Sequence, residues 1–427
     1  MSKNKMVKIG VLGVGRGAGF AKGAESLGMK LVALCDTWEE KLNKLGKALN
    51  VSTYTDYDKF LQHDMDAVVL ANYFYQHAPF AIKALKAGMH VMSETSACFT
   101  LAEGVALIEA VEKSGKIYFF AENYPYMGFN CEMRKLYRKG EMGKFLYGEG
   151  EYVHPMVASS SNSISPGMDH WRNWLPATYY CTHSVGPVMY ITDTMPVKVN
   201  GFIVPRDCDD AKYKKTVRVA DLASSIIVRM DNGAIVKSLH GGLKGHGNWV
   251  RIHCNKGLME NLRIGDWFML RIRKEPFDSK PGEPVEKIYR PDASSYARET
   301  GRRGHLECDD LMFYYFSQAI KTGKQPYMDV YRGVAMSIVG IQAYRSALND
   351  SNTVEVPDLR KKSERVKYAN DDWNPDPSRH KNGYPFPSVL GKVAPSKQGI
   401  SYARKIWAKS GYREKEQEKY GKERRES

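Results

Sequence analysis

The chain has 427 residues, of which 43% are hydrophobic and 26% are charged, and its formal net charge is +15. This length is too great for one ordinary hydrophobic core and favours two domains of a globular protein. The sequence has no run of about 18 apolar residues, which a membrane-spanning helix needs. Because the first residues also lack the apolar region of a signal peptide, we expect a cytoplasmic protein without a membrane partner.

Neither the charge nor the cysteines indicate a special partner. Residues 397–427 hold ten Lys or Arg against five Glu, a third of the positive excess, which favours a solvated tail over a nucleic-acid-binding arm. The remaining charge would suit an anionic sugar or a phosphorylated cofactor. The seven cysteines form no C-x-x-C motif, so we expect neither a disulfide framework nor a zinc site.

In chain order, residues 7–123 alternate apolar runs with helical stretches. The run VKIGVLGVG (7–15) ends in glycines, and MKLVALCD (29–36) follows after one helical stretch. This pattern continues and predicts an α/β domain with a parallel, doubly wound sheet, in which ligands bind outside the carboxyl ends of the strands. The further predicted strands are residues 66–72, 90–94 and 117–123, and the further predicted helices are residues 78–88 and 101–115.

After about residue 143, longer segments of alternating polarity replace the short apolar runs. The sequence Asp231-Asn232-Gly233 between two of them is a strong hairpin signal, so we expect an α+β domain with a mostly antiparallel sheet. Helical periodicity returns near residues 305–348, which we expect to pack back on the first domain. Prolines and charges then indicate an extended segment. The predicted divisions are residues 1–126, residues 127–352 and a C-terminal segment, residues 353–427.

A glycine-rich hexapeptide, Gly-Val-Gly-Arg-Gly-Ala, lies between the first predicted strand and helix. It matches the Rossmann fingerprint G-x-G-x-x-G/A, whose glycines let the backbone approach a pyrophosphate. Asp36 ends the second strand, where an acid binds the ribose 2′-hydroxyl and repels a 2′-phosphate, so NAD is favoured over NADP. The alternatives are that Asp36 caps a helix and that Arg16 contacts solvent. The predicted cofactor-binding residues here are Gly13, Gly15, Arg16, Gly17, Ala18 and Asp36.

Polar side chains end three further predicted strands, at Asn72, Glu94 and Asn123. Since the carboxyl ends of parallel strands meet at one edge, we expect these residues where the nicotinamide lies. Glu94 ends an apolar strand, so its carboxylate either has a functional partner or accepts backbone amides of the next turn. Tyr126 follows in a polar, aromatic cluster. A tyrosine of lowered pKa transfers protons, although buried tyrosines more commonly serve packing.

Residues 152–188 concentrate histidine, arginine and tyrosine side chains in the second domain. Histidine suits proton transfer to and from a hydroxyl, and His183 opens a stretch with a helical pattern, so we expect it to face the cleft. Three of the histidines are separated by 16 and 13 residues, which matches no compact ligand motif, so we expect no metal. The candidate residues are His154, His170, Arg172, Tyr180 and His183.

Over nearly its whole length the chain resembles the glucose-fructose oxidoreductase/inositol dehydrogenase/MocA (Gfo/Idh/MocA) family. The similar stretches are LGVGRGA (12–18), residues 71–95 and EMRKLYRKGEMGKFLYGEGEYVH (132–154). The resemblance implies an N-terminal Rossmann domain, a C-terminal open-faced sheet and the oxidation of sugar or cyclitol hydroxyls with NAD(P). By this resemblance, His77 is the histidine that opens the helix after the fourth core strand, and Glu94 belongs to the family's Glu-Lys-Pro signature.

The signature here is Glu94-Thr95-Ser96, without the lysine that polarises the hydroxyl or carbonyl in ordinary dehydrogenases of the family. One branch, glycoside hydrolase family 109, also lacks this lysine. The chain resembles that branch at AENYPY, EGEYVHP, YYCTHSVGPV and MDVYRGVAMSIV, but lacks the Asp-Leu-Arg that follows its histidine strand. By this resemblance, Glu94, Tyr126, Tyr180 and His183 contact the cofactor or the substrate.

The branch resemblance implies that a glycosidic bond is cleaved without net redox change, through oxidation at C3, loss of the C2 proton, elimination at C1, water addition and re-reduction. Tyr126 and His183 are the predicted proton-transfer residues. Two alternatives stay open: a plain NAD-dependent sugar or cyclitol dehydrogenase, and a non-catalytic NAD(H)- or sugar-binding regulator, which the missing lysine favours. The sequence also leaves a homo-oligomer open. The predicted substrate-binding residues are Thr95, His154, His170, Arg172 and Tyr180.

Overall fold

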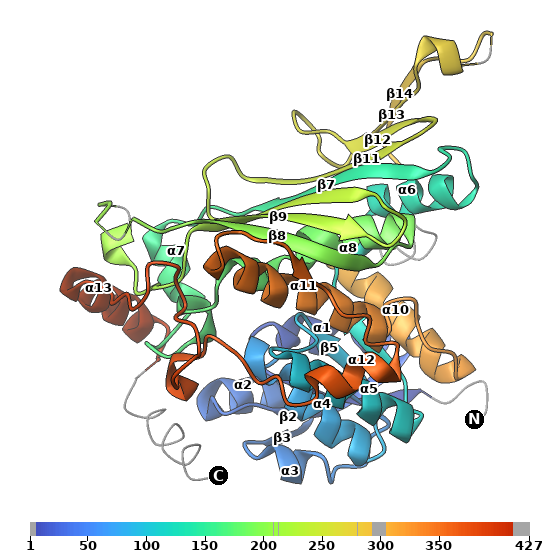
Figure 1. Ribbon diagram of the computed structural model, residues 1–427. Coiled ribbons are helices and arrows are strands. Elements are labelled where there is room, and N and C mark those ends of the chain that lie inside the picture. Colours follow the sequence, from blue (N-terminus) through green and yellow to red (C-terminus); the bar gives the residue numbers. More distant parts are fainter. Residues whose placement is uncertain (1–5, 208, 212, 280, 293–304, 413–427) are drawn as a thin grey trace.

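Two β-sheets, with helices between and around them, form the framework of the protein (Figure 1). The predicted fold class is confirmed, because a doubly wound parallel sheet precedes a mostly antiparallel one. The computed structural model describes residues 6–207, 209–211, 213–279, 281–292 and 305–412.

The first sheet is parallel and has the strand order β3-β2-β1-β4-β5-β6. Its central strands are apolar throughout because both faces of such a sheet are covered. The strand order reverses between β1 and β4, and ligands of doubly wound sheets bind beyond the strand ends at such a point. The strands are β1 (Val7–Leu12), β2 (Met29–Cys35), β3 (Ser52–Tyr54), β4 (Ala67–Leu70), β5 (His90–Glu94) and β6 (Tyr118–Ala121).

Polar caps fix where several helices begin. The hydroxyl of Thr100 accepts the Glu103 amide at 3.1 Å at the start of α5, and Asp56 accepts the Lys59 amide at the start of α3. Around the first sheet lie α1 (Gly17–Gly23), α2 (Glu39–Leu49), α3 (Tyr57–Phe60), α4 (His77–Lys86) and α5 (Leu101–Ser114). The later helices are α6 (Gly128–Arg138), α7 (Ala158–Ser163), α8 (Thr182–Thr192), α10 (His305–Thr322), α11 (Val330–Leu348), α12 (Lys362–Tyr368) and α13 (Lys397–Lys409).

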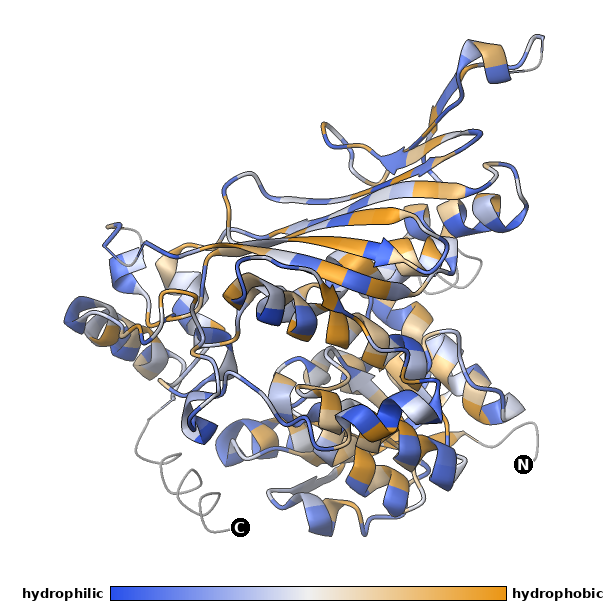
Figure 2. Cartoon of the chain, in the orientation of Figure 1, coloured by the Kyte–Doolittle hydropathy of each residue, from blue (hydrophilic) through white to orange (hydrophobic). Residues whose placement is uncertain are grey.

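The second sheet has the order β14-β13-β12-β11-β7-β10-β9-β8-β15, and only its β10–β7 pair is parallel among the described residues. The predicted Asn-Gly hairpin joins β9 to β10. Hydrophilic and hydrophobic bands alternate along these strands (Figure 2), as expected when one face packs on helices. The strands are β7 (Phe145–Val153), β8 (Pro196–Val204), β9 (Ala223–Met230), β10 (Ile235–Gly241), β11 (Gly247–Cys254), β12 (Gly257–Asn261), β13 (Leu270–Arg273), β14 (Glu286–Tyr289) and β15 (Val354–Glu355).

Helices α8 and α11 lie between the two sheets (Figure 1). Every residue of α8 is buried. The second sheet approaches α8 closely at Gly150 in β7, where a Cβ would lie 1.9 Å from the carbonyl oxygen of Ser184. On the other side, the amide of Phe120 in β6 donates to the carbonyl of Met328 at 2.8 Å, just before α11. The C-terminal helices therefore contact the first sheet.

Much of the C-terminal segment is packed against the body of the protein. Trp407 of α13 is only 1% exposed, and its indole nitrogen donates to the carbonyl of Asn162 at 2.9 Å, near the end of α7. Helix α13, the first half of the predicted solvated tail, is thus packed through an apolar face. Its lysine and arginine side chains are exposed. Residues 413–427, the rest of that tail, and Cys208 lie outside the described residues.

No helix in the described part of the chain combines the length and apolar character that crossing a membrane requires. In the same residues, no group of three or more His, Cys, Asp or Glu side chains is arranged to hold a metal ion.

Gly150→Ala tests the close contact between β7 and α8. We expect the free energy of unfolding to fall by about 1–3 kcal/mol, because the added methyl group must push the backbone of α8 away. The matched control is Gly247→Ala in β11, where nothing lies within 4 Å of the new Cβ. Urea denaturation followed by circular dichroism measures both values, and equal losses in the two variants would contradict the interpretation.

Candidate active site

The glycine-rich turn joins the end of β1 to α1 at the point where the strand order reverses. Gly13 has a φ of +95°, and a Cβ there would lie 2.3 Å from the carbonyl oxygen of Ala71, so only glycine fits. Its amide donates to the carbonyl of Cys35 at 2.8 Å. At Gly15, by contrast, no described atom would lie within 4 Å of an added Cβ, so the turn is open there. A phosphate group can therefore approach the backbone of this turn.

Asp36 lies directly after β2 and beside the glycine-rich turn. One carboxylate oxygen accepts the amide of Val14 at 2.7 Å, and the other accepts the amide of Trp38 at 2.8 Å, just before α2 begins. Burial raises the pKa of Asp36, and these backbone hydrogen bonds oppose that shift. The alternative of a helix cap is wrong, because α2 (Glu39–Leu49) has Trp38 at its N-cap position and no side-chain cap; Asp36 accepts amides of the two turns beside it and is held where an acid would bind a ribose.

A cavity of about 230 Å³ opens at the carboxyl ends of β4, β5 and β6 and is closed on the other side by the second domain. Asn72 is notable in it, because its amide nitrogen and amide oxygen are buried without a hydrogen-bond partner among the described residues. Unpaired buried amides are costly, so this side chain fits a polar ligand. The structure brings together these predicted residues: Arg16, Asn72, His77, Glu94, Thr95, Asn123, Arg172, Tyr180 and His183.

Arg16 links the glycine-rich turn to two distant carboxylates. Its Nε donates to Glu94 at 2.8 Å, and its two terminal nitrogens each bind one oxygen of Asp309 in α10 at 2.7 Å. Burial alone would lower the pKa of Arg16, but the two carboxylates raise it, so the guanidinium stays charged. Glu94 thus has a specific cationic partner, besides the amide of Thr95 at 3.3 Å. Sequence analysis missed Asp309, because it lies 293 residues from Arg16 and no local pattern marks it.

A buried carboxylate meets a histidine at the wall of the cavity, where His183 lines the cavity and Glu122 lies behind it. The Nδ1 atom of His183 lies 2.6 Å from Oε1 of Glu122, which is fully buried and comes directly after β6. A carboxylate at Nδ1 favours the tautomer with its proton on that atom, which leaves Nε2 free to accept one. The other oxygen of Glu122 is buried without a partner in the described part of the chain. Sequence analysis assigned Glu122 no role.

Three tyrosine rings surround His183. Tyr124 stacks on the imidazole with a centroid separation of 4.4 Å, and Tyr152 and Tyr180 meet it edge-on, each at 4.8 Å. Burial raises the pKa of all three phenols above the ordinary value. They therefore stay protonated at neutral pH and can donate hydrogen bonds, but they are poor bases.

Other predicted residues lie elsewhere. Tyr126 does not line the cavity, because the short 3-10 turn η3 (Tyr124–Tyr126) places its ring among Phe119, Tyr190 and Tyr315. Burial raises its pKa well above the ordinary value, which does not suit a base. The structure thus brings Tyr124, and not Tyr126, to the site.

His170 also lies outside the cavity. It is buried, and its Nδ1 accepts the amide of Arg172 at 3.2 Å, so it shapes the turn that carries Arg172. His154 lines a second cavity beside the first. Ala18 is half-buried in the first turn of α1, so only its backbone would face a ligand of the glycine-rich turn.

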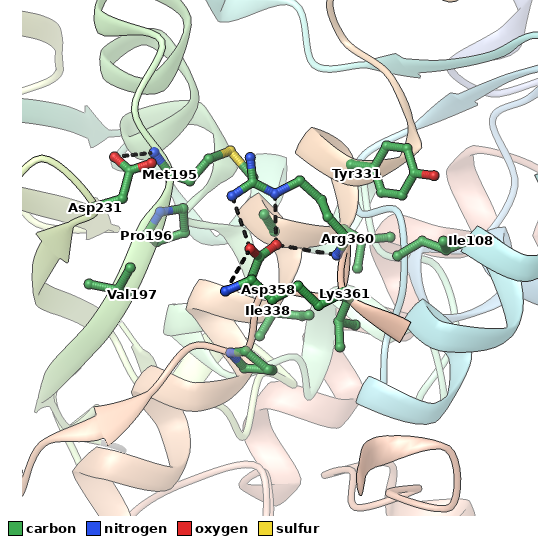
Figure 3. A pocket seen from close by; sticks show the side chains of 14 residues that line it. Ile108, Met195, Pro196, Val197, Asp231, Tyr331, Ile338, Asp358, Arg360 and Lys361 are labelled. Carbon is green, nitrogen blue, oxygen red and sulfur yellow. Dashed lines mark hydrogen bonds and ion pairs between the residues drawn. The ribbon is translucent and has the colours of Figure 1, made fainter. Parts of the chain in front are cut away.

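A cavity far from the strand ends, shown in Figure 3, has a different character. It lies between β8, α11 and residues 357–361, with a volume of about 220 Å³. Of its two cations, Arg360 is bound to both oxygens of Asp358, at 2.7 and 3.1 Å, and Lys361 lies 3.7 Å from the same carboxylate, while Asp231 accepts the amide of Met195. Because these charged groups are satisfied within the chain, this cavity is not a candidate for the chemistry.

Comparison with known proteins agrees with this geometry. Residues 7–122 match the Gfo/Idh/MocA family model, described as an oxidoreductase family with an NAD-binding Rossmann fold. An alpha-N-acetylgalactosaminidase of Shewanella oneidensis is 24% identical over 400 residues, covering 84% of this chain and 86% of that protein. A glycosyl hydrolase family 109 protein of Shewanella woodyi is 24% identical over 405 residues, covering 84% and 85%.

Solved structures share the fold. Levoglucosan dehydrogenase in complex with NADH has a TM-score of 0.72 at 18% identity, over 82% of this chain and 99% of that one. An aldose-aldose oxidoreductase from Caulobacter crescentus, complexed with glycerol, has a TM-score of 0.65 at 20% identity, over 82% and 100%.

The predicted resemblance to the Gfo/Idh/MocA family, and within it to glycoside hydrolase family 109, is confirmed. The chain is an NAD-dependent enzyme, and the part that matches the family model, residues 7–122, is its NAD-binding Rossmann fold. The residues present fit that cofactor. The open turn at Gly15 suits the pyrophosphate, the carboxylate of Asp36 suits a ribose, and the unpaired amide of Asn72 suits the carboxamide of nicotinamide.

Asp36→Asn tests the choice between NAD and NADP. The amide keeps the shape of the side chain but removes the charge that would repel a 2′-phosphate, so we expect the affinity ratio of NADP to NAD to rise about tenfold. Isothermal titration with each dinucleotide measures it. Asp58→Asn, an exposed position in α3, serves as the control, and an unchanged ratio in Asp36→Asn would show that Asp36 only caps the turn.

Proposed function

We propose that the protein acts on a carbohydrate and cleaves a glycosidic bond after transient oxidation of the sugar at C3. The observation that carries the proposal is the buried Glu122–His183 pair, whose histidine lines a cavity where Thr95 replaces the usual lysine. The relatives named alpha-N-acetylgalactosaminidase and glycosyl hydrolase family 109 protein support the glycosidic bond as target. The fold shared with levoglucosan dehydrogenase supports a sugar as substrate.

NAD+, when bound, supplies the hydride acceptor for C3 and, once reduced, the donor that restores it. The residues that would hold it are those of the glycine-rich turn with Asp36, and, at the nicotinamide side, Asn72 and Asn123. Glu94 and Arg16 form the wall between the turn and the cavity.

His183 would move the protons. Oxidation at C3 also frees the hydroxyl proton, which would pass by way of Nε2 of His183 to water, so that the imidazole is neutral again; re-reduction would take a proton from water by the same route. The carbonyl at C3 acidifies the C2 proton, which Nε2 would then remove, while the carboxylate of Glu122 at Nδ1 stabilises the resulting imidazolium. The C2 electron pair then forms a C1–C2 double bond and breaks the C1–O bond. The imidazolium protonates the leaving oxygen. In the return direction, His183 would take a proton from water as its oxygen adds to C1, and would deliver that proton to C2.

The surrounding side chains would bind and orient the sugar. Because Tyr124, Tyr152 and Tyr180 stay protonated, they would donate hydrogen bonds to sugar oxygens and not compete with His183 as bases. Thr95 is buried, and its hydroxyl hydrogen-bonds the hydroxyl of Thr182 at 2.7 Å. This position therefore carries no acid, and the proton transfers depend on His183.

A plain sugar dehydrogenase is the second candidate function. It is favoured by the fold shared with levoglucosan dehydrogenase, and a histidine with a buried carboxylate can also accept the proton of a hydroxyl during simple oxidation.

An assay with aryl glycosides separates these functions. With catalytic amounts of NAD+, we expect release of the aglycone while absorbance at the NADH band stays constant, since the cofactor is restored in each cycle. Free sugars with stoichiometric NAD+ form the parallel reaction. NADH formed in proportion to oxidised sugar, without aglycone release, would establish the dehydrogenase instead.

Variants at the buried pair test the proton-transfer role. His183→Ala should lower kcat at least about 100-fold, the usual contribution of a general base, and Glu122→Gln should lower it less. Both should retain the NAD affinity of the parent, measured by titration. Tyr126→Phe should stay within about twofold of the parent, whereas Tyr124→Phe should be slower, because only Tyr124 lies in the cavity. If Tyr126→Phe were slow and Tyr124→Phe were as fast as the parent, the role that the sequence predicted for Tyr126 would stand.

A further inference from the structure

A second cavity, of about 370 Å³, adjoins the proposed reaction site. The two share Tyr152, Trp171, Arg172 and Tyr180, so a ligand can extend from one into the other past the aromatic rings. All residues that line the second cavity lie between positions 152 and 242. It is therefore formed by the second domain and is separate from the glycine-rich turn that fits the pyrophosphate.

Three arginines from different segments line this second cavity. Arg172 lies on the turn η4 (Trp171–Asn173), Arg206 follows β8, and Arg218 precedes β9. The guanidinium of Arg172 stacks on Trp171 at 4.2 Å, and Arg206 stacks on Tyr213 at 4.9 Å and donates from Nε to the carbonyl of Ala220. These ring and carbonyl contacts orient the two cations and carry no negative charge themselves.

Of the three arginines, Arg218 has a buried guanidinium nitrogen, Nε, without a hydrogen-bond partner among the described residues. No ion pair joins Arg172 or Arg218 to a described carboxylate. Burial, together with the charges of Arg206 and Arg172, lowers the pKa of Arg218 to about 9. Like charges held together in a partly dry cavity are costly, unless an anion joins them.

Asp221 is the carboxylate among the residues that line this cavity, and it is already engaged. One of its oxygens accepts the hydroxyl of Ser388 at 2.7 Å, and the other accepts the amide of Val389 at 3.0 Å. Asp221 is 4% exposed, and burial raises its pKa. In the cavity of Figure 3, by contrast, Arg360 has its own carboxylate partner in Asp358. The carboxylate of Asp221 also acts electrostatically on Arg206, so the positive charge that remains available to a ligand lies at Arg172 and Arg218, with Arg206 beside them.

We propose that the second cavity binds an anionic group of the substrate, held by Arg172, Arg206 and Arg218, and that the protein acts on an acidic carbohydrate. The anion is a carboxylate, sulfate ester or phosphate ester on the sugar unit that would occupy the second cavity, next to the one in the reaction site, so an acidic monosaccharide carries the group that the cavity binds. Guanidinium groups bind all three through paired hydrogen bonds. The identity of the substrate rests on the proposed function, whereas the anion site rests on the arginines alone.

Binding to the NAD-loaded full chain tests this assignment independently of turnover. Titration compares glucose with glucuronate, glucose 6-sulfate and glucose 6-phosphate, and inorganic sulfate is titrated as the anion alone. We expect at least one acidic sugar to bind about tenfold or more tightly than glucose, and the ranking identifies the kind of anion. Equal binding of glucose and all three acidic sugars would overturn the proposal.

Arg218→Met and Arg206→Met supply the variants, since methionine keeps apolar bulk but removes the charge. We expect each to lose the preference for the acidic sugar while binding glucose as the parent does. Arg360→Met, in the cavity of Figure 3, is the matched control and should keep the preference. Unchanged NAD affinity shows that the variants are folded, and a preference that survives in both Arg206→Met and Arg218→Met contradicts the proposal.

The proposed function and the anion site fail separately. If no sugar binds but inorganic sulfate binds to the parent and not to Arg218→Met, the anion site stands and the carbohydrate function is wrong. If neither sulfate nor any acidic sugar binds, the anion site is wrong, and aglycone release from neutral aryl glycosides still tests the reaction.

Discussion

The hydrogen bond between Glu122 and His183 constrains how the two halves of the protein fit together. Glu122 follows the last strand of the first sheet, and His183 lies in the first turn of α8 beneath the second sheet. A fully buried carboxylate is tolerated only beside a polar or cationic partner, so α8 must meet the end of β6. Small residues permit this approach: Gly150 admits the backbone of α8 from above, and a Cβ at Gly186 would lie 3.2 Å from the Glu122 side chain.

The contact between Glu122 and His183 also fixes where the other residues of the site lie. The strand ends of the first sheet carry the polar groups Asn72, Glu94 and Asn123, and the turns before α8 carry Trp171, Arg172 and Tyr180. His183 lies where both sets meet. The arginine-lined cavity adjoins this one, so the residues proposed for the cofactor, for proton transfer and for anion binding would follow one another along one path.

The sequence predicts what depends on local pattern. The glycine-rich turn, the polar strand ends Asn72, Glu94 and Asn123, and the Asn-Gly hairpin are set by neighbouring residues, and sequence analysis located them. Pairings across the chain carry no such signal: Glu122 and His183 are 61 residues apart, and Arg16 and Asp309 are 293 apart. The three-residue turn η3 places Tyr124 in the cavity and Tyr126 outside it. Such a short turn has no periodic pattern from which the side-chain directions could be predicted. Arg206 and Arg218 lie in irregular segments, where only the fold brings them together.

The contact of Arg16 with Asp309 bears on how such a protein can evolve. A Rossmann domain is commonly regarded as an exchangeable module, but here the arginine of its own phosphate-binding turn takes its bidentate partner from α10, and β6 donates a backbone hydrogen bond to the segment before α11. The first domain is therefore completed by α10 and the segment before α11, which follow the second sheet in the sequence. A first domain moved to another protein without α10 and α11 would lose both contacts, so its exchange would have to carry these helices with it.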